Sequence, residues 1–246
     1  MIKKKLIITG CGIKSLSHLT KENEIAIKQA EKVCYLVNEP VSAAWIQKNS
    51  KSHESLEDLY YSEEIRSLSY QKIVNYILLE LDKYSNLCVV VYGHPILLSD
   101  SINSLIETIN EDIVELEVQP AISSFDCLLA DLKIDTASGC YSIEANELLN
   151  NEKILDPTNH LIIWQIGILG NNEIYSGNSL NGLNDLKNKL LQIYDKPHKC
   201  ILYEAAIYPH IPPKITETTI ASIDASQLSR LTTAYIPPQV EISKSI

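Results

Sequence analysis

Three apolar runs, each ending in a tight turn of small residues, most constrain the fold of this chain. The runs are Leu6 to Thr9, Leu87 to Val91 and Ile113 to Val118. The turns that follow them are Gly10-Cys-Gly12, Gly93-His-Pro95 and Pro120-Ala-Ile-Ser-Ser124. Parallel strands of α/β proteins have their carboxyl ends at one sheet edge, where cofactors bind. The sequence therefore predicts a parallel sheet with a ligand site at that edge.

Helical patterns separate these strands, as a parallel sheet requires. Thr20 is a favoured N-cap, and helix formers follow it to Lys32. Residues 33–37 form a second expected strand. Further helices are expected over residues 40–48, 62–83 and 100–110. In residues 62–83, apolar side chains recur near one face, as in an amphipathic helix.

The second half of the chain has a different pattern. Ser123 is a favoured N-cap for a helix over 124–132, with Asp126 in its first turn. Strands are expected over residues 161–166, 200–204 and 232–236, and a helix over residues 183–194. Short strands between Pro-rich and Asn/Gly-rich turns indicate a mixed sheet. We therefore expect two domains, residues 1–119 and residues 120–246.

Composition disfavours several classes of function. The formal net charge of −10 disfavours nucleic acid as a partner, because binding phosphates requires clustered Lys and Arg. No apolar run approaches the roughly 20 residues that span a bilayer. The six cysteines occur singly, without a Cys-x-x-Cys pair, so a metal site has little support. Unpaired cysteines suit a reducing compartment, so a cytoplasmic protein is expected.

Several polar and glycine motifs have both a structural and a functional interpretation. Gly10 and Gly12 resemble a dinucleotide fingerprint, but Ser15 stands where its third glycine belongs, so a tight turn explains them equally well. His94 is a lone histidine, a type that is more often structural than catalytic. Arg66 and Tyr70 are four residues apart and share a helix face. From spacing alone, a solvated Arg stacked on a surface Tyr is the favoured interpretation.

Four longer strings resemble borosin peptide backbone α-N-methyltransferases, a branch of the tetrapyrrole methylase superfamily. They are residues 10–20, residues 126–135, residues 156–166 and Tyr235-Ile-Pro-Pro238. The resemblance implies a two-domain α/β fold. Its N-terminal domain has a mostly parallel sheet with helices, and its C-terminal domain has a mixed sheet with helices. S-adenosylmethionine binds in the cleft between them, and S-adenosylhomocysteine is the product.

The resemblance also implies roles for individual residues. The family's Tyr…Arg…Tyr set falls on Tyr60, Arg66 and Tyr70. Tyr70 is then the base, Arg66 lowers its pKa from the usual value of about 10, and Tyr60 binds the substrate carbonyl. Tyr92 lines the space between the methyl donor and the amide. Cofactor contacts are implied for Gly10, Gly93, His94, Leu97, Ser123, Ser124, Gln165, Ala205 and Thr232.

Expectations about partners follow from the same resemblance. Some borosins carry their substrate as a C-terminal extension, whereas this chain ends at Ile246, soon after Pro238. A separate precursor peptide is therefore expected, with a homodimer that becomes a heterotetramer with two precursors.

Two departures from the family pattern leave alternatives open. Ile96 and Ala121 stand where the family usually has glycine, so a reshaped cofactor loop is expected. One alternative is a methyltransferase of the same fold that acts on a tetrapyrrole or another small molecule. The other is a silent peptide-binding homologue.

Overall fold

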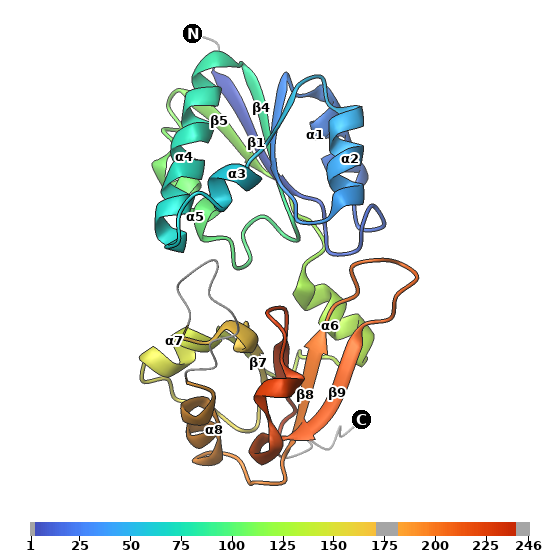
Figure 1. Cartoon of the computed structure of the whole chain (residues 1–246), viewed down its shortest axis with the longest axis vertical. Helices are drawn as coiled ribbons and strands as arrows, with labels where there is room; N and C mark the ends of the chain where they lie inside the picture. Colours follow the sequence, from blue (N-terminus) through green and yellow to red (C-terminus); the bar gives the residue numbers. More distant parts are fainter. Residues whose placement is uncertain (1–2, 171–181, 240–246) are drawn as a thin grey trace. The chain divides into compact units, whose positions relative to one another are not determined.

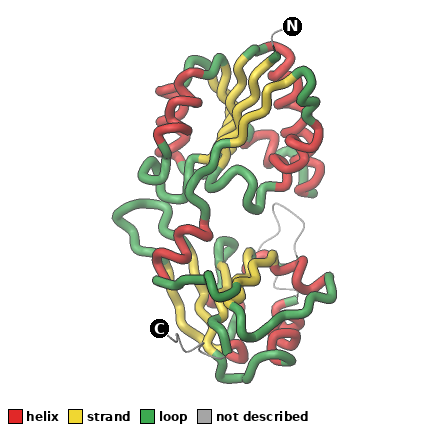
Figure 2. The backbone as a smooth tube through the Cα atoms, turned by 180° about the vertical axis from the view of Figure 1, so that it is seen from behind, coloured by secondary structure: helices red, strands yellow, loops and turns green. Residues whose placement is uncertain are grey.

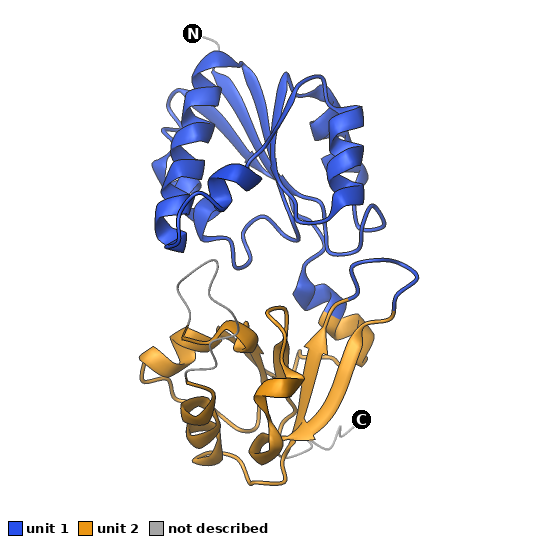
Figure 3. Ribbon diagram, in the orientation of Figure 1, with its two compact units in different colours: residues 1–127, 206–211 blue, residues 128–205, 212–246 orange. Residues whose placement is uncertain are grey.

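The computed structural model describes residues 3–170 and 182–239. Its contacts divide the chain into two compact units (Figure 3). Unit 1 comprises residues 1–127 and 206–211, and unit 2 comprises residues 128–205 and 212–246. Helix α6 (Ser124–Leu132) carries the chain from the first unit to the second. That the chain forms two domains which divide before Pro120 stays a prediction.

Unit 1 is a parallel sheet between two layers of helices (Figure 1). Its elements are β1 (Lys4–Gly10), α1 (Lys21–Gln29), β2 (Lys32–Leu36), α2 (Pro40–Asn49), β3 (His53–Ser55), α3 (Glu57–Tyr60), α4 (Arg66–Lys83), β4 (Asn86–Val91), α5 (Asp100–Thr108) and β5 (Val114–Val118). The strand order is β3-β2-β4-β1-β5, and every pair is parallel. Helices α1 and α2 pack on one face, and α4 and α5 on the other.

The sheet register places the three sequence turns at one edge. In β1 and β4, Gly10 lies opposite Val91, and in β1 and β5, Ile8 lies opposite Val118. All three strands run in the same direction, so their carboxyl ends are adjacent. Figure 2 shows the strands of this sheet side by side, seen from behind. The prediction of a parallel N-terminal sheet is confirmed.

Unit 2 is built on a mixed sheet. Its elements are β6 (Cys140–Glu144), α7 (Ala145–Asn150), β7 (His160–Trp164), α8 (Leu183–Leu191), β8 (Lys199–Glu204), β9 (Lys214–Thr219), β10 (Thr233–Ile236) and three short 3₁₀ turns at Ile166–Ile168, Ile220–Ser222 and Ala225–Gln227. The order is β6-β7-β10-β8-β9, in which only the β6–β7 pair is parallel. One sheet face packs on α7 and α8 through a buried aliphatic cluster. The predicted mixed sheet is confirmed.

Some predicted boundaries are wrong. The helix expected from residue 62 begins at Arg66, and Tyr60 ends a separate short helix, α3. The first helix ends at Gln29 because Ala30 is extended, and Lys32 already belongs to β2. The strand expected over 161–166 ends at Trp164, because the next residue is left-handed.

Sequence reasoning also missed three strands and two short α-helices. The strands are β3, β6 and β9, and the helices are α3 and α7. The helices have four and six residues, and β9 is a polar edge strand without an apolar run. Such segments are stabilised by their neighbours and have weak local signals. Among the described residues, no helix is long and apolar enough to cross a membrane.

Candidate functional site

The turns after β1 and β4 are joined by their backbones. The Gly12 N–H donates to the Gly93 carbonyl at 3.3 Å, and the Gly93 N–H donates to the Gly12 carbonyl at 3.0 Å. Both glycines have positive φ, of 75° and 73°. A Cβ added at Gly10 would lie 1.9 Å from the Gly93 carbonyl oxygen. Glycine is therefore required where the two turns meet, and this close approach brings bare backbone to the sheet edge.

The segment after Gly93 is shaped by His94. Its Nδ1 accepts a hydrogen bond from the Ile96 N–H at 3.2 Å. Ile96 itself is not in the left-handed region, whereas Leu98 is, with φ of 55°. The replacement of glycine by Ile96 therefore causes no backbone strain at that position. Leu97 follows Ile96 in the chain, and both side chains are exposed.

The turn at residues 120–124 is held at both ends. The Ser123 hydroxyl donates to the Asp126 carboxylate at 2.6 Å, and the Asp126 N–H donates back to that hydroxyl at 3.2 Å. This is the predicted N-cap of α6, which ends the turn at Ser124. At the other end, the Asn23 amide donates to the Pro120 carbonyl at 3.3 Å. Ala121 is buried, and a Cβ at Gly10 would lie 2.8 Å from its methyl carbon.

The predicted tyrosine–arginine set is brought together at the start of α4. The rings of Tyr60 and Tyr70 have their centroids 6.1 Å apart, and Tyr61 contacts Tyr60 edge-to-face at 5.0 Å. Arg66 is the first residue of α4, where the helix dipole disfavours a cation. Its Nε is buried and has no hydrogen-bond partner within the described part of the chain. A buried nitrogen without a partner is unusual, so this placement fits an arginine that binds a polar ligand better than a solvated surface arginine.

Burial decides the protonation of Tyr70. The pKa of its phenol is raised to about 12, mainly by desolvation and to a smaller extent by the neighbouring Tyr60 and Asp100. Arg66 lowers the pKa of Tyr70, as expected, but less than burial raises it. Burial likewise raises the pKa of Tyr92, which lies near Cys11, Cys127 and Glu39. Both phenols are therefore neutral at neutral pH in this structure.

The three predicted residues of unit 2 also meet at one sheet edge. Ala234 of β10 lies opposite Ile163 of β7 and Leu202 of β8. Since β10 is antiparallel to both, the residue before it, Thr232, lies at the edge where β7 and β8 end. Gln165 and Ala205 directly follow those two strands.

Two details of this edge bear on ligand binding. Gln165 is left-handed, with φ of 60°, a conformation that non-glycine residues adopt rarely and often at functional sites. A Cβ added at Gly167 would lie 1.7 Å from the Ser229 carbonyl oxygen, so glycine lets the segments after β7 and before β10 touch. Both features resemble the close turns of unit 1.

The Thr232 hydroxyl is engaged inside unit 2. It donates to Glu204 Oε1 at 2.8 Å and accepts from the Ser229 N–H at 2.7 Å. Burial raises the pKa of Glu204, but hydrogen bonds from Lys214, Thr232 and Ser229 outweigh it and lower that pKa. Thr232 therefore offers a ligand its methyl group or backbone more readily than its hydroxyl.

Sequence reasoning missed Glu204 and Asn23, since neither lies in a recognisable motif.

The structure shows no metal-binding arrangement in its described residues. Within residues 3–170 and 182–239, no three His, Cys, Asp or Glu side chains gather as metal ligands. Five of the six cysteines are buried, and Cys140 is exposed. At the start of α4, the polar groups that lie together are phenols and a guanidinium.

Comparison with known proteins identifies the family of this chain. A family model described as Tetrapyrrole (Corrin/Porphyrin) Methylases matches residues 5–224. The chain therefore belongs to the tetrapyrrole methylase family, whose members are S-adenosylmethionine-dependent methylases.

Solved structures share this fold. The uroporphyrin-III-C-methyltransferase of Thermus thermophilus has a TM-score of 0.68 at 13% identity, over 96% of this chain and 92% of its own. The precorrin-6Y methylase of Archaeoglobus fulgidus has a TM-score of 0.62 at 20% identity, over 96% of this chain and 99% of its own. At such identities, the likeness shows the fold alone.

Curated relatives carry a further description. A "Methyltransferase/ribosomally synthesized type I borosin cyclic peptide precursor" of Gymnopilus junonius is 33% identical over 95% of this chain and 57% of its own length. A similarly described protein of Serendipita vermifera is 32% identical over 95% of this chain and 59% of its own length. This chain thus spans less than two thirds of these relatives, which combine a methyltransferase with a precursor.

Proposed function

We propose that this chain transfers methyl groups from S-adenosylmethionine to backbone amide nitrogens of a ribosomal precursor peptide. The observation that carries the proposal is the placement of Tyr60, Arg66 and Tyr70. In the chain, helix α4 comes after β3 and before β4, which are parallel strands of one sheet. The helix that connects them runs antiparallel to them and starts near their carboxyl ends. The set therefore lies on the same side of unit 1 as the glycine turns.

The residues next to the strand ends of each unit suit a bound cofactor. A Cβ at Gly10 would collide with the Gly93 carbonyl oxygen, so glycine there lets the two turns meet, and their backbone would line the cofactor site. His94, Leu97, Ser123 and Ser124 would complete the contacts in unit 1. Gln165, Ala205 and Thr232 would supply those of unit 2. The cofactor, when bound, supplies an electrophilic methyl group on a positively charged sulfur.

The protein must make a poor nucleophile reactive. An amide nitrogen has a delocalised lone pair and a weakly acidic proton, so positioning and proton removal are the main tasks. Tyr60 would donate a hydrogen bond to the substrate carbonyl, which stabilises the imidate that forms. Tyr70 would accept the amide proton, and Arg66 would stabilise the tyrosinate. Tyr92 would line the space between donor and amide.

A peptide supplied as a separate molecule tests this proposal. We expect tandem mass spectrometry to show successive gains of one methylene on backbone nitrogens of a borosin precursor peptide. Tyr70→Phe should abolish these gains while S-adenosylhomocysteine binds with nearly unchanged affinity. Tyr76→Phe is the matched control, since Tyr76 is a partly buried tyrosine further along α4 whose pKa is also raised, to about 12.

Other outcomes would contradict the proposal. Full methylation by Tyr70→Phe would exclude this residue as the base. Methylation of a tetrapyrrole with no change to any peptide would show the small-molecule activity. No S-adenosylhomocysteine binding by calorimetry would indicate the silent peptide-binding homologue. The separate precursor is part of the proposal, and the chain's end at Ile246 lies outside the described residues.

A further inference from the structure

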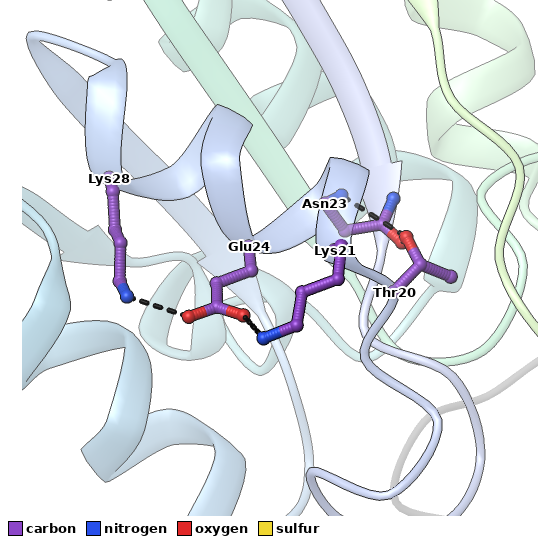
Figure 4. A network of polar contacts seen from close by, with 5 residues as sticks. All are labelled: Thr20, Lys21, Asn23, Glu24 and Lys28. Atoms are coloured by element: carbon purple, nitrogen blue, oxygen red, sulfur yellow. Dashed lines mark hydrogen bonds and ion pairs between the residues drawn. The ribbon is translucent and has the colours of Figure 1, made fainter.

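A buried asparagine connects three segments of unit 1. Asn23 lies in the first turn of α1 and is fully buried. Its Nδ2 donates to the Thr9 hydroxyl near the end of β1 and to the Pro120 carbonyl after β5, the latter at 3.3 Å. The loop before α1 joins the network through Thr20, whose hydroxyl donates to Asn23 Oδ1 (Figure 4).

The geometry uses nearly all the bonding capacity of this side chain. An asparagine amide has two N–H donors and one carbonyl acceptor, and each is engaged here. The Asn23 backbone N–H also donates to the Thr20 hydroxyl at 3.1 Å, which caps α1. Capping alone requires only the backbone of residue 23. The amide of the side chain is therefore what links α1 to the strand ends.

The neighbouring charged residues in the same network differ from Asn23. Glu24 pairs with Lys21 at 2.8 Å and Lys28 at 2.6 Å on the outer side of α1 (Figure 4). These pairs lower the pKa of Glu24 to about 2, but they lie at the surface, where ion pairs contribute little to stability. Asn23 points the other way, to the strand ends that carry the cofactor turns.

We propose that Asn23 is a positioning residue for the cofactor. It fixes the turn at residues 120–124, and this turn contacts the cofactor. The bond to the Pro120 carbonyl fixes the start of this turn, and the cap of α6 at Ser123 fixes its end. Ala121 and Ile122 lie between these anchors, and Ser123 and Ser124, which are proposed to contact the cofactor, follow them. A buried amide that fixes a binding turn preorganises it and reduces the cost of ordering on binding. This inference rests on the proposed function.

Calorimetric binding of S-adenosylhomocysteine tests the role of Asn23. We expect Asn23→Ala to weaken binding about tenfold or more, since each tenfold corresponds to the net worth of one or two buried hydrogen bonds. Glu24→Gln, next in the chain, should bind as the unchanged protein does. Asn86→Ala removes an asparagine at the opposite end of the sheet, where β4 begins. It should also keep its affinity, even if it lowers the melting temperature.

The outcomes separate this inference from the function it rests on. No binding by the unchanged protein would contradict the proposed function. Unchanged affinity in a folded Asn23→Ala variant would overturn the inference, as would equal losses in Asn23→Ala and Asn86→Ala. If Asn23→Ala does not fold, Thr9→Val keeps the buried volume and removes one bond of the network. We expect a several-fold weaker affinity for Thr9→Val, and unchanged affinity would overturn the inference.

Discussion

Arg66 and Tyr70 show how one pair of side chains depends on its surroundings. Their spacing on α4 allows the guanidinium to lower the pKa of the phenol, and it does so. Burial nevertheless raises that pKa to about 12, so a single cation does not make Tyr70 a base at neutral pH. A further favourable charge at the site would have to complete the activation during the reaction.

The pH dependence of methylation should report this balance. A base acts only when deprotonated, so below the pKa of Tyr70 the single-turnover rate should rise about tenfold per pH unit. Arg66→Gln removes the charge that lowers this pKa, so the rise should move to higher pH. Arg66→Lys keeps the charge and should shift the profile less. Superimposable profiles for the Arg66→Gln variant and the unchanged protein would exclude this role of Arg66.

At the level of elements, the main feature is the contact between strand ends. β1 and β4 are adjacent parallel strands, and the turns that follow them are hydrogen-bonded to each other at Gly12 and Gly93. In unit 2, the segments that flank β7 and β10 touch in a similar way at Gly167 and Ser229. In both units, glycine allows backbone segments from neighbouring strands to approach each other at a sheet edge.

Gly10→Ala should disrupt this contact in unit 1. The added methyl would lie 1.9 Å from the Gly93 carbonyl oxygen, which is backbone and cannot rotate away. We expect a loss of about 1–3 kcal/mol in the free energy of unfolding, measured by urea denaturation, and weaker S-adenosylhomocysteine binding. Adding Ala121→Gly removes only the contact of the new methyl with the Ala121 side chain, at 2.8 Å. The double variant should therefore regain neither stability nor affinity. Full recovery would show that Ala121, and not Gly93, sets the requirement.

At the level of the whole chain, each unit has its predicted cofactor-contact residues next to strand ends at one edge of its own sheet. The units have separate buried clusters, one in unit 2 and two on the faces of the unit 1 sheet.

The net charge of −10 opposes self-association through unscreened repulsion, so a dimer would need an apolar interface.

The expected homodimer can be measured directly. We expect sedimentation equilibrium to give twice the chain mass of 27.6 kDa, and the dimer to persist when salt is raised, because salt screens the repulsion between the chains and does not weaken an apolar interface. A single-chain mass across micromolar concentrations would contradict the expected dimer. It would leave the chemistry proposed for Tyr60, Arg66 and Tyr70 untouched.

Local sequence by itself determined the apolar strands, the glycine and proline turns after them, and the cap of α6 at Ser123. These depend on burial patterns and backbone preferences that act within a few residues. Only the tertiary structure decided that Asn23 joins β1 to the Pro120 turn, that Glu204 engages the Thr232 hydroxyl, and that burial outweighs Arg66 at Tyr70. Such outcomes depend on desolvation and on partners distant in sequence, which no local pattern contains.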